Sequence, residues 1–518
     1  MCGILFYDGF LLDNEYLIEC LNNISLRGPD NQQIHYDGTK FFGFNRLSIN
    51  GLDEISNQPF VIDNIILIVN GEIFNWKTLY EENPEFDYKS NSDCEIIIHM
   101  YKKYGVDKMI KSLDGEFAFV LYDKNEDKLV IGRDHLGIRG LFIGTKGENE
   151  IMVGSELKSI HQDFNIKQFS PGHYYVNGEM TKYYNYEFET KTYDESFIYS
   201  QLNYLLTKAV EKRLMSDRPI SCLLSGGLDS TLVCAIVKKL YKHPLNTYSI
   251  GIKGSTDLRY AKIASEYLGT NHTTIELDEE DFLNAIRETI YAIESYDTTT
   301  VRASVGNYLV SKYIKENSED TVLFCGDVSD EIFGSYRGFT LAPNEKEFKK
   351  ENEKMLSMIH FFDVLRSDRS ISNCSLEARV PFCDKELVNF VMSLHPKHKM
   401  FNTEIMEKMI LRKSFEGYLP YELLYRRKEA FSDGVSSVEK SWFEIIQDDL
   451  DVKISDEEFY TKKNLYKHNP PISKEALYYR EIFEKYYPNK SNIIPHFWMP
   501  NKKWCNVNDP SARVINTN

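Results

Sequence analysis

The sequence predicts two domains of different fold class, an α+β domain followed by an α/β domain that ends in a helical part. Residues before about 185 read mostly as short strands and hairpins with few helices. From Gln201 onward, apolar strands alternate with helices, which is typical of a parallel sheet with helical crossovers. The chain has 518 residues, more than one hydrophobic core supports, so a division into domains is expected.

The first half contains the β-rich run 64–74 and two further β-rich runs around a polar middle within residues 116–134, which predict a hairpin. Residues 92–105 predict an amphipathic helix. Ser92 and Glu95 have the spacing of a capping box at its start.

The second half opens with a strand, a glycine loop and a helix within residues 220–240. Further strands are predicted at residues 246–252, 272–277 and 321–327, and helices dominate after them. The polar segment 187–200 is expected to be the linker between the two halves.

The composition argues against several kinds of partner. The formal net charge of −17 disfavours nucleic acid or an anionic membrane, although a locally positive pocket is still able to bind a small anion. The nine cysteines are scattered and never spaced C-x-x-C, which indicates reduced thiols rather than disulfides or zinc ligands. No apolar run approaches the ~18 residues of a membrane span. We therefore expect a cytoplasmic protein that binds neither nucleic acid nor membrane.

An anion-binding loop is predicted at SGGLDS (225–230), between an apolar strand and a helix. Its two glycines let the backbone turn so that successive N–H groups converge on an anion at the helix N-terminus. The sequence has no G-x-x-x-x-G-K-[ST] motif, so a P-loop NTPase is not supported. Asp229 would repel phosphate unless a divalent cation lay between them. A plain strand-to-helix turn would explain the glycines but not the added aspartate and serines.

A second acidic loop, CGDVSDE (325–331), follows another predicted strand. Ligands of parallel α/β sheets bind at the carboxyl ends of strands, where both loops lie. Asp229 and Asp330 could therefore jointly hold Mg²⁺ on a pyrophosphate. The alternative is a run of helix-capping residues, which fits Glu331 better than Asp330.

The chain begins MCGILFYDGF, with Cys2 directly behind Met1. Taken alone, this cysteine fits a chance occurrence, a buried residue of a first strand, or a nucleophile exposed by removal of Met1. Apolar strand starts that contain cysteine are common, so the rest of the chain has to decide between these interpretations.

The motifs together resemble those of glutamine-hydrolysing asparagine synthetases. The second half matches through SGGLDS, the SDE loop, SYDTTTVRAS, LEARVPFCD and RRKEAFSDGV, and the first half through MCGI, SLRGPD, RLSI, NGEIFN, SDCE, LDGEFAF and RDHLG. The C-terminal WCNVNDPSAR is also similar. The resemblance implies an N-terminal-nucleophile (Ntn) hydrolase domain of layered antiparallel sheets at residues 2–187, which is a class II glutamine amidotransferase. It implies a PP-loop ATP pyrophosphatase domain with a parallel sheet at residues 201–518.

The resemblance makes Cys2 the nucleophile of glutamine hydrolysis. Once Met1 is removed, the free α-amine of Cys2, with an ordinary pKa near ~8, is able to act as the base for its own thiol. The side chain of Asn70 and the N–H of Gly71 would stabilise the oxyanion.

The same resemblance assigns the carboxylate of glutamine to Arg46, whose forked guanidinium suits it, and the ammonium group to Glu72 and Asp93. Outside these motifs, Arg46 or Glu72 would usually be a solvated charge and Asp93 a helix-start residue. These three roles therefore depend on the family match.

In the second half, the resemblance implies that the β-carboxylate of aspartate attacks the α-phosphate of ATP. Pyrophosphate leaves, and ammonia then displaces AMP from β-aspartyl-AMP. The residues expected to bind ATP are Leu223, Ser225, Gly226, Gly227, Asp229, Ser230, Ile250, Cys325 and Gly326. Asp229 and Asp330 would bind Mg²⁺, and Lys428 would neutralise charge on the α-phosphate.

Two positions depart from the family pattern. The family usually has Glu-Gly where this chain has Asp327-Val328, and that acid is thought to assist formation or attack of the adenylate. Val328 cannot adopt a positive φ without strain, so we expect the loop backbone to be re-aimed to compensate for the shorter acid. Gly140 stands where the family has proline, and we expect it to loosen a glutaminase loop.

Other functions fit the sequence less well. A β-lactam-forming synthetase shares the two-domain plan but typically lacks the catalytic cysteine. A phosphoribosyl or hexosamine amidotransferase shares only the first half, and the SGGLDS loop excludes it. A non-catalytic interaction protein is the alternative that stays open. The expected substrates are glutamine, aspartate and ATP, and a homodimer is compatible with the sequence.

Overall fold

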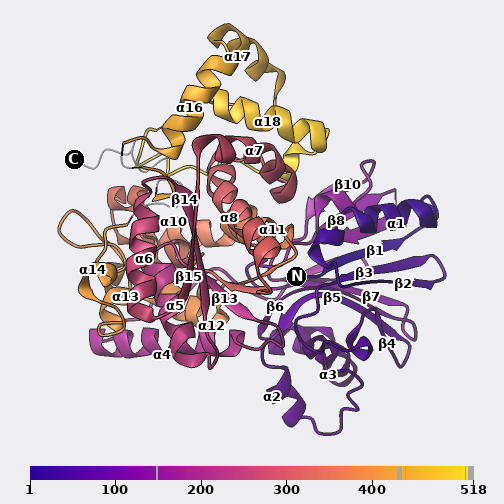
Figure 1. Cartoon of the computed structure of the whole chain (residues 1–518). Coiled ribbons are helices and arrows are strands. Elements are labelled where there is room, and N and C mark those ends of the chain that lie inside the picture. Colours follow the sequence, from indigo (N-terminus) through magenta and orange to yellow (C-terminus); the bar gives the residue numbers. More distant parts are fainter. Residues whose placement is uncertain (148–149, 429–433, 438, 508, 511–518) are drawn as a thin grey trace. The chain divides into compact units, whose positions relative to one another are not determined.

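The computed structural model describes residues 1–147, 150–428, 434–437, 439–507 and 509–510, and Figure 1 shows its helices and strands. The chain forms two compact units. Unit 1 comprises Met1–Asn185, Met215–Pro219 and Ile371–Ala378, and unit 2 comprises Tyr186–Leu214, Ile220–Ser370 and Arg379–Asn518. The chain therefore returns to unit 1 twice after leaving it.

Unit 1 contains two six-stranded antiparallel sheets. The first has the order β10-β8-β9-β1-β3-β2, with β1 (Gly3–Asp8), β2 (Asn31–Asp37), β3 (Lys40–Arg46), β8 (Phe142–Lys146), β9 (Glu150–Gly154) and β10 (Asn165–Gln168). The second has the order β12-β11-β7-β6-β5-β4, with β4 (Phe60–Ile62), β5 (Ile65–Ile73), β6 (Gly115–Asp123), β7 (Lys128–Arg133), β11 (His173–Val176) and β12 (Glu179–Lys182). The predicted α+β class and the hairpin within residues 116–134, which is β6–β7, are confirmed.

The apolar pattern of β5 explains how unit 1 is layered. Ile66 and Ile68 pack on one face with residues of β1 and β3, which come from the other sheet. Leu67 and Val69 pack on the opposite face with α3 (Ile96–Ser112). Because successive strand residues point to opposite faces, a strand that is covered on both sides needs a continuous apolar run. The remaining helices of this unit are α1 (Asn14–Asn22) and α2 (Trp76–Glu81).

The predicted capping box before α3 is wrong. The Ser92 hydroxyl accepts a hydrogen bond from the backbone N–H of Cys94 (3.3 Å), in a short 3₁₀ turn before the helix. The Glu95 carboxylate instead accepts from the N–H groups of Lys89 (2.7 Å) and Ser90 (2.6 Å). Glu95 therefore binds the backbone of residues 89–90, upstream of the helix, instead of the backbone N–H of Ser92 that a capping box requires.

Unit 2 is built on a five-stranded sheet with the order β15-β14-β13-β16-β17. Its strands are β13 (Ile220–Leu223), β14 (Asn246–Ile252), β15 (Asn271–Leu277), β16 (Val322–Phe324) and β17 (Glu377–Arg379). β13 pairs in parallel with β14 and β16, and β14 pairs in parallel with β15, so the predicted parallel sheet is confirmed. The carboxyl ends of β13 and β16, each followed by a predicted loop, lie side by side.

Helices make up most of the rest of unit 2. They are α4 (Glu195–Arg213), α5 (Leu228–Leu240), α6 (Thr256–Leu268), α7 (Glu279–Ile293), α8 (Thr298–Asn317), α9 (Ser329–Phe333), α10 (Glu345–Met358), α11 (Asp363–Ser372), α12 (Lys385–Ser393), α13 (Met409–Ser414), α14 (Tyr421–Leu424), α16 (Trp442–Lys453), α17 (Asp456–Lys462) and α18 (Lys474–Tyr486). The last three gather in the yellow region of Figure 1, where α18 also packs on α7. The helical C-terminal part is confirmed.

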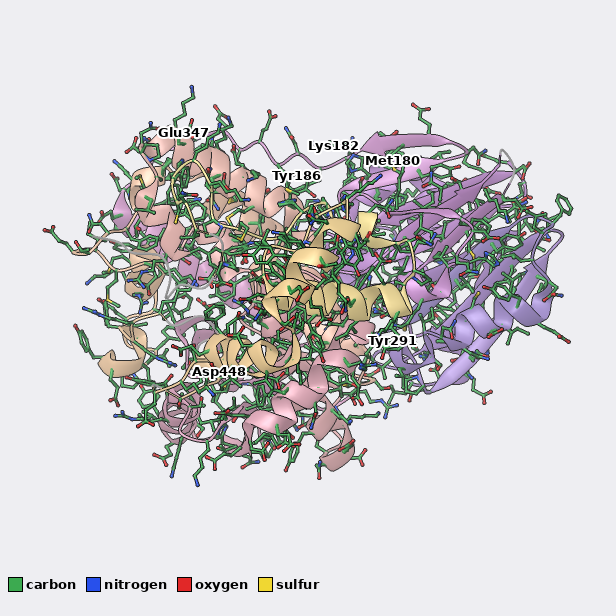
Figure 2. The ribbon with its side chains drawn as sticks, turned by 90° about the horizontal axis from the view of Figure 1, so that it is seen from above. Met180, Lys182, Tyr186, Tyr291, Glu347 and Asp448 are labelled. Carbon is green, nitrogen blue, oxygen red and sulfur yellow. The ribbon has the colours of Figure 1, made fainter. Side chains whose placement is uncertain are left out.

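Figure 2 draws the side chains and labels Met180 and Lys182 in β12, and Tyr186, where unit 2 begins. Within the parts of the chain that the structure describes, no helix combines the length and the hydropathy that a membrane crossing requires.

Candidate active sites

Cys2 lies at the start of β1, whose register places Gly3 opposite Asn45, next to Arg46 at the end of β3. The Cys2 thiol is 3.7 Å from the carbonyl oxygen of Leu47. Burial raises the pKa of this thiol, and the nearby Arg46 guanidinium acts in the opposite direction. The α-nitrogen of Cys2 is part of the peptide bond to Met1, so its amine exists only after Met1 has been removed.

Asn70 carries the most informative contact pattern of unit 1. Its side chain is fully buried in β5, and neither amide atom has a hydrogen-bond partner among the residues that the structure describes. A buried amide without a partner costs free energy, so such a group commonly serves a ligand or a reaction intermediate. Gly71 follows it with φ 151°, and a Cβ atom there would lie 2.1 Å from the carbonyl oxygen of Glu116. Only glycine allows this approach of β5 to β6.

The Arg46 guanidinium is buried and held by a loop. It donates to the carbonyl oxygens of Asp53 (2.9 Å) and Gly51, and to the side-chain oxygen of Asn57 (2.6 Å). These acceptors are neutral, so they orient the guanidinium without neutralising its charge. The arrangement suits recognition of a carboxylate.

Glu72 and Asp93 lie near the same point. Glu72 accepts a hydrogen bond from the side chain of Asn50, and Asp93 accepts from the backbone N–H of Ile73 (2.6 Å). Burial raises the pKa of the Cys94 thiol well above its usual value, and the charges of Asp93, Glu72 and Cys2 raise it further. The Cys94 thiol, which the sequence analysis did not single out, is 3.3 Å from the carbonyl oxygen of Gly71 and 3.8 Å from Asp93 Oδ2. Burial raises the pKa of both thiols, but only Cys2 gains a base of its own, the α-amine that removal of Met1 creates.

The loop that precedes Gly140 is held by buried charged side chains. The Asp134 carboxylate accepts from the N–H groups of Ile138 (2.9 Å) and Arg139 (3.0 Å). The Arg133 guanidinium donates to the carbonyl oxygens of Gly137 and Arg139, both at 2.8 Å. These contacts fix residues 137–139, and the effect of glycine in place of proline at position 140 stays a prediction.

Unit 2 contains a cavity of about 210 Å³ at the carboxyl ends of β13 and β16. The predicted residues that line it are Leu223, Ser225, Gly227, Asp229, Ser230, Cys325, Gly326, Asp327, Asp330 and Lys428. Residues that sequence reasoning missed also line it, namely Asp257, Thr299, Ala303, Asn307, Tyr336, Asp363 and Arg366. Residues 429–433 of the RRKEAFSDGV motif, and residues 508 and 511–513 of the C-terminal motif, lie outside the described residues.

Two predicted ATP-binding residues are placed elsewhere. Ile250 is buried within β14, opposite Ile275 of β15. Gly226 has φ 73°, and a Cβ atom there would lie 2.4 Å from the backbone nitrogen of Ala261 in α6. The glycine therefore serves the turn and the packing of α6 rather than the wall of the cavity.

The carboxylates of Asp229 and Asp330 are brought together, but an ammonium group lies between them. Lys408 Nζ is 2.6 Å from Asp229 Oδ2 and 2.5 Å from Asp330 Oδ1. Lys428 Nζ is also 2.5 Å from Asp330 Oδ1. Burial raises the pKa of Asp330, but the two lysines outweigh it, so the net shift is downward. Burial likewise lowers the pKa of Lys408, and the two carboxylates outweigh it, so that pKa is raised.

These contacts bear on the expected metal. Among the described residues, no cluster of three or more His, Cys, Asp and Glu side chains has the arrangement of a metal site. Two carboxylates that face one cation position nevertheless fit Mg²⁺, which commonly takes one or two carboxylates and fills its remaining positions with phosphate oxygens and water. Lys408 belongs to no motif of the sequence analysis, and no local signal marks it.

Asp327 is clamped from α11. Its Oδ1 accepts a hydrogen bond from Arg366 Nη2 (2.9 Å), and its Oδ2 accepts one from the Ser367 hydroxyl. The expectation that the backbone at Val328 is re-aimed is wrong, because Val328 itself has φ 75° and ψ −8°. The β-branched residue keeps the left-handed conformation that favours glycine, at a cost on the order of 1–3 kcal/mol.

The helix-capping role expected for Glu331 is not observed. Glu331 is buried within α9, and its carboxylate accepts a hydrogen bond from the Tyr336 hydroxyl. Burial raises the pKa of Glu331 well above its usual value, and the neighbouring Asp363 and Asp330 add to the shift. The carboxyl group therefore belongs to the acidic wall of the cavity.

A second, smaller cavity of about 60 Å³ lies beside the SGGLDS loop. Its lining has five basic and three acidic residues and comprises Gly227, Leu228, Asp229, Asp330, Glu407, Lys408, Arg412, Arg426, Arg427 and Lys428. Five positive side chains beside a glycine turn and the start of α5 form a suitable environment for phosphate groups. Arg426 and Arg412 each have a carboxylate partner, Asp257 at 2.8 Å for the former and Glu407 for the latter.

Comparison with known proteins agrees with this division of the chain. Residues 1–209 match the glutamine amidotransferase domain family, and residues 201–352 and 340–504 match the asparagine synthase family. The asparagine synthetase (glutamine-hydrolyzing) of Cricetulus griseus is 39% identical over 560 residues, which cover 99% of this chain and 98% of that protein. The corresponding human protein is 38% identical over the same shares. A probable asparagine synthetase (glutamine-hydrolyzing) of Acanthamoeba polyphaga mimivirus is 40% identical over 99% of this chain and 100% of that protein.

Proposed function

The chain belongs to the glutamine-hydrolysing asparagine synthetase family, and from this premise we propose how its residues carry out the reaction. The enzyme hydrolyses glutamine and uses ATP to convert aspartate to asparagine. The observation that carries the assignment of the sites is the gathering of sequence-distant motif residues within each unit. Asp93 accepts a hydrogen bond from Ile73 of β5, directly after Asn70, Gly71 and Glu72, and both acidic loops of unit 2 line one cavity.

In unit 1, the Cys2 thiol attacks the amide carbon of glutamine after Met1 has been removed. The free α-amine takes the thiol proton and returns a proton to the leaving ammonia. The unpartnered amide of Asn70 and the N–H of Gly71 stabilise the oxyanion. Water then hydrolyses the thioester to glutamate.

The same unit recognises glutamine through charge. Arg46 pairs with the α-carboxylate, because its hydrogen-bond acceptors leave its charge uncompensated. Glu72 and Asp93 receive the ammonium group. We assign this glutaminase to residues 2–187, which the family match at 1–209 supports.

In unit 2, the adenosine lies in the larger cavity against Leu223, Cys325 and Gly326, and the phosphates face the SGGLDS loop. The β-carboxylate of aspartate displaces pyrophosphate from the α-phosphorus of ATP, and ammonia then displaces AMP. Lys428 neutralises charge that develops on the α-phosphate. Asp327, oriented by Arg366, assists formation or attack of the adenylate. We assign this activity to residues 201–518.

Asp229 and Asp330 would hold Mg²⁺. When bound, this ion supplies neutralisation of the pyrophosphate leaving group. In the ligand-free arrangement their charge is met by lysine side chains instead.

A homodimer stays compatible with the sequence, and we further propose that the enzyme works in the cytoplasm and has no nucleic-acid partner. The net charge of −17 supports the last point, and nine free cysteines suit a reducing compartment.

The test is an assay of pyrophosphate release with ATP and Mg²⁺, in which aspartate is compared with glutamate as the acceptor. Each acceptor is assayed with glutamine and with ammonium chloride as nitrogen source. When aspartate is the acceptor, we expect pyrophosphate, AMP and asparagine to appear in equal amounts with either nitrogen source. We expect none of these products when glutamate is the acceptor. Equal release with glutamate, or release without formation of an amide, would contradict the assignment.

A further inference from the structure

Lys408 occupies an unusual position for a lysine outside the predicted motifs. It precedes α13 with φ 56°, a left-handed conformation that costs energy for a residue other than glycine. Its side chain is 2% exposed, and its ammonium group contacts one carboxylate from each acidic loop. An ordered, buried ammonium group at the point where two loops meet fixes the distance between them.

The spacing of these carboxylates suits a smaller cation. Asp229 Oδ2 and Asp330 Oδ1 contact the same nitrogen at 2.6 and 2.5 Å, so they lie at most about 5 Å apart. Mg²⁺ holds oxygen ligands at ~2.0–2.1 Å, which places opposite ligands about 4 Å apart. The carboxylates therefore need to approach by only about 1 Å to exchange the ammonium group for the metal ion.

The two cations cannot share this position. A divalent ion between the carboxylates would stand against the Lys408 ammonium, with like charges in a buried site where screening is weak. Lys428 adds a further positive charge on the same oxygen of Asp330. Binding of the metal ion alone would thus require Lys408 to leave both partners without gaining another.

Phosphate groups would change this balance. The smaller cavity, lined by five basic and three acidic residues, adjoins Lys408 and the SGGLDS loop, so an anion placed there would offer the ammonium group a new partner. Arg412 and Arg426 pair with Glu407 and Asp257, which are not the expected metal ligands. Both partners of Lys408 are the expected metal ligands, so Lys408 is the side chain that has to change partners when the ion binds.

We propose that Lys408 is a positioning residue that holds Asp229 and Asp330 close to the arrangement that a divalent cation needs. Its ammonium group releases the two carboxylates to the cation only when it binds phosphate groups instead. This inference rests on the proposed function of unit 2. It makes metal binding conditional on the nucleotide, so that the unliganded site does not retain a divalent ion.

The test measures binding of Mn²⁺ alone to the full chain by electron paramagnetic resonance, without nucleotide. Lys408→Met removes the ammonium and keeps an apolar stem of similar length. Lys413→Met is the matched control, because it makes the same change on α13 at an exposed lysine that pairs with Glu416. We expect Lys408→Met to bind Mn²⁺ at least tenfold more tightly than the parent, and Lys413→Met to bind like the parent. The gain should disappear when Asp330→Asn is added.

Unchanged Mn²⁺ affinity in Lys408→Met would overturn the proposal, as would a gain that survives Asp330→Asn. A second readout is calorimetric binding of pyrophosphate without metal, which we expect to weaken at least tenfold in Lys408→Met. If Lys408→Met does not fold, Lys408→Gln is used, and the same outcomes apply to it. None of these measurements needs turnover, so a failure of the proposed reaction appears in the pyrophosphate-release assay and a failure of this inference appears in the binding data.

Discussion

Asp327 Oδ1 lies 2.9 Å from Arg366 Nη2, and this pairing fixes the acid of the second loop from a different helix. The same guanidinium nitrogen is 3.0 Å from Asp363, so Arg366 joins two carboxylates of the cavity. The Ser367 hydroxyl binds the other oxygen of Asp327. Both oxygens of Asp327 are thereby oriented although the side chain is one methylene shorter than the glutamate usual in the family.

We expect Asp327→Ala to reduce ammonia-dependent asparagine formation by ~10²-fold or more, because a positioned acid would be lost. Asp327→Glu should also be slower than the parent, since a longer side chain cannot keep both contacts and would crowd the adenylate. Adding Val328→Gly should restore part of that rate by freeing the loop. Steady-state assays of the three variants with ammonia as nitrogen source decide this.

A role for Ser367 is tested in the same assay. Ser367→Ala should form asparagine more slowly than the parent. Asp327→Glu should reduce this rate less in the Ser367→Ala background, where the longer side chain has more space. Ser357→Ala, at a half-buried serine in α10 that bonds only within its own helix, is the control. An Asp327→Ala enzyme as fast as the parent would remove this acid from the mechanism.

Asp229→Asn or Asp330→Asn should abolish adenylation, with ATP–pyrophosphate exchange reduced by ~10²-fold or more, because each change removes half of the site for the cation on pyrophosphate. Glutaminase activity should remain, since the residues that we propose for that reaction lie in unit 1. Exchange at the parental rate in either variant would mean that these carboxylates serve only to bind the lysines.

Cys2→Ala should abolish glutamine-dependent asparagine formation, by ~10³-fold or more, and leave ammonia-dependent formation unchanged. Only the first reaction uses the thiol. Cys20→Ala, which changes a buried thiol in α1, should retain both activities. Loss of both activities in folded Cys2→Ala would contradict two separable sites.

The sequence was sufficient where a local pattern has one structural outcome. The hairpin of β6 and β7 and the two loops at the ends of β13 and β16 were predicted because alternation and glycine placement act over a few residues. The convergence of Asp229 and Asp330 followed from the general rule that parallel strands end at one edge of a sheet.

Local patterns could not predict contacts that folding alone creates. Lys408 is 179 positions from Asp229, and nothing near it in sequence distinguishes it from a solvated lysine. Residues Ile371–Ala378 join unit 1 although the sequence before and after them belongs to unit 2. The positive φ of Val328 was unexpected because surrounding contacts outweigh the intrinsic preference of a β-branched residue.

The lowered pKa of Lys399 predicts that the free energy of unfolding depends on pH. Its buried amino group donates to the side chain of Asn352 (2.6 Å) and to the carbonyl oxygen of Ile332 (3.2 Å), and burial lowers its pKa to about 7. An unfolded chain has a lysine pKa near ~10.4, so between pH 7 and 10 the unfolded state binds a proton that the folded state does not. The contribution of Lys399 to the free energy of unfolding therefore rises with pH, by up to ~1.4 kcal/mol per unit.

Urea unfolding of the parent and of Lys399→Met between pH 7 and 9 measures this effect. The free energy of unfolding of the parent, relative to that of Lys399→Met, should increase as pH rises. Lys397→Met, an exposed neighbour, should show no such change. A difference that is constant with pH would contradict a lowered pKa for Lys399.

The burial of Met1 predicts that this residue is removed before unit 1 folds. It is fully buried, its amine donates to the carbonyl oxygen of Leu376 (3.4 Å), and its sulfur contacts the guanidinium of Arg139. An aminopeptidase cannot reach a terminus held in this way, so removal of Met1 has to precede folding of unit 1.

Protein made with the aminopeptidase inhibited should lack glutaminase activity and retain ammonia-dependent synthesis. Aminopeptidase added to the folded protein should restore little activity, whereas treatment before refolding should restore it, with loss of Met1 followed by mass spectrometry. Equal recovery by both routes would show that the buried terminus opens readily.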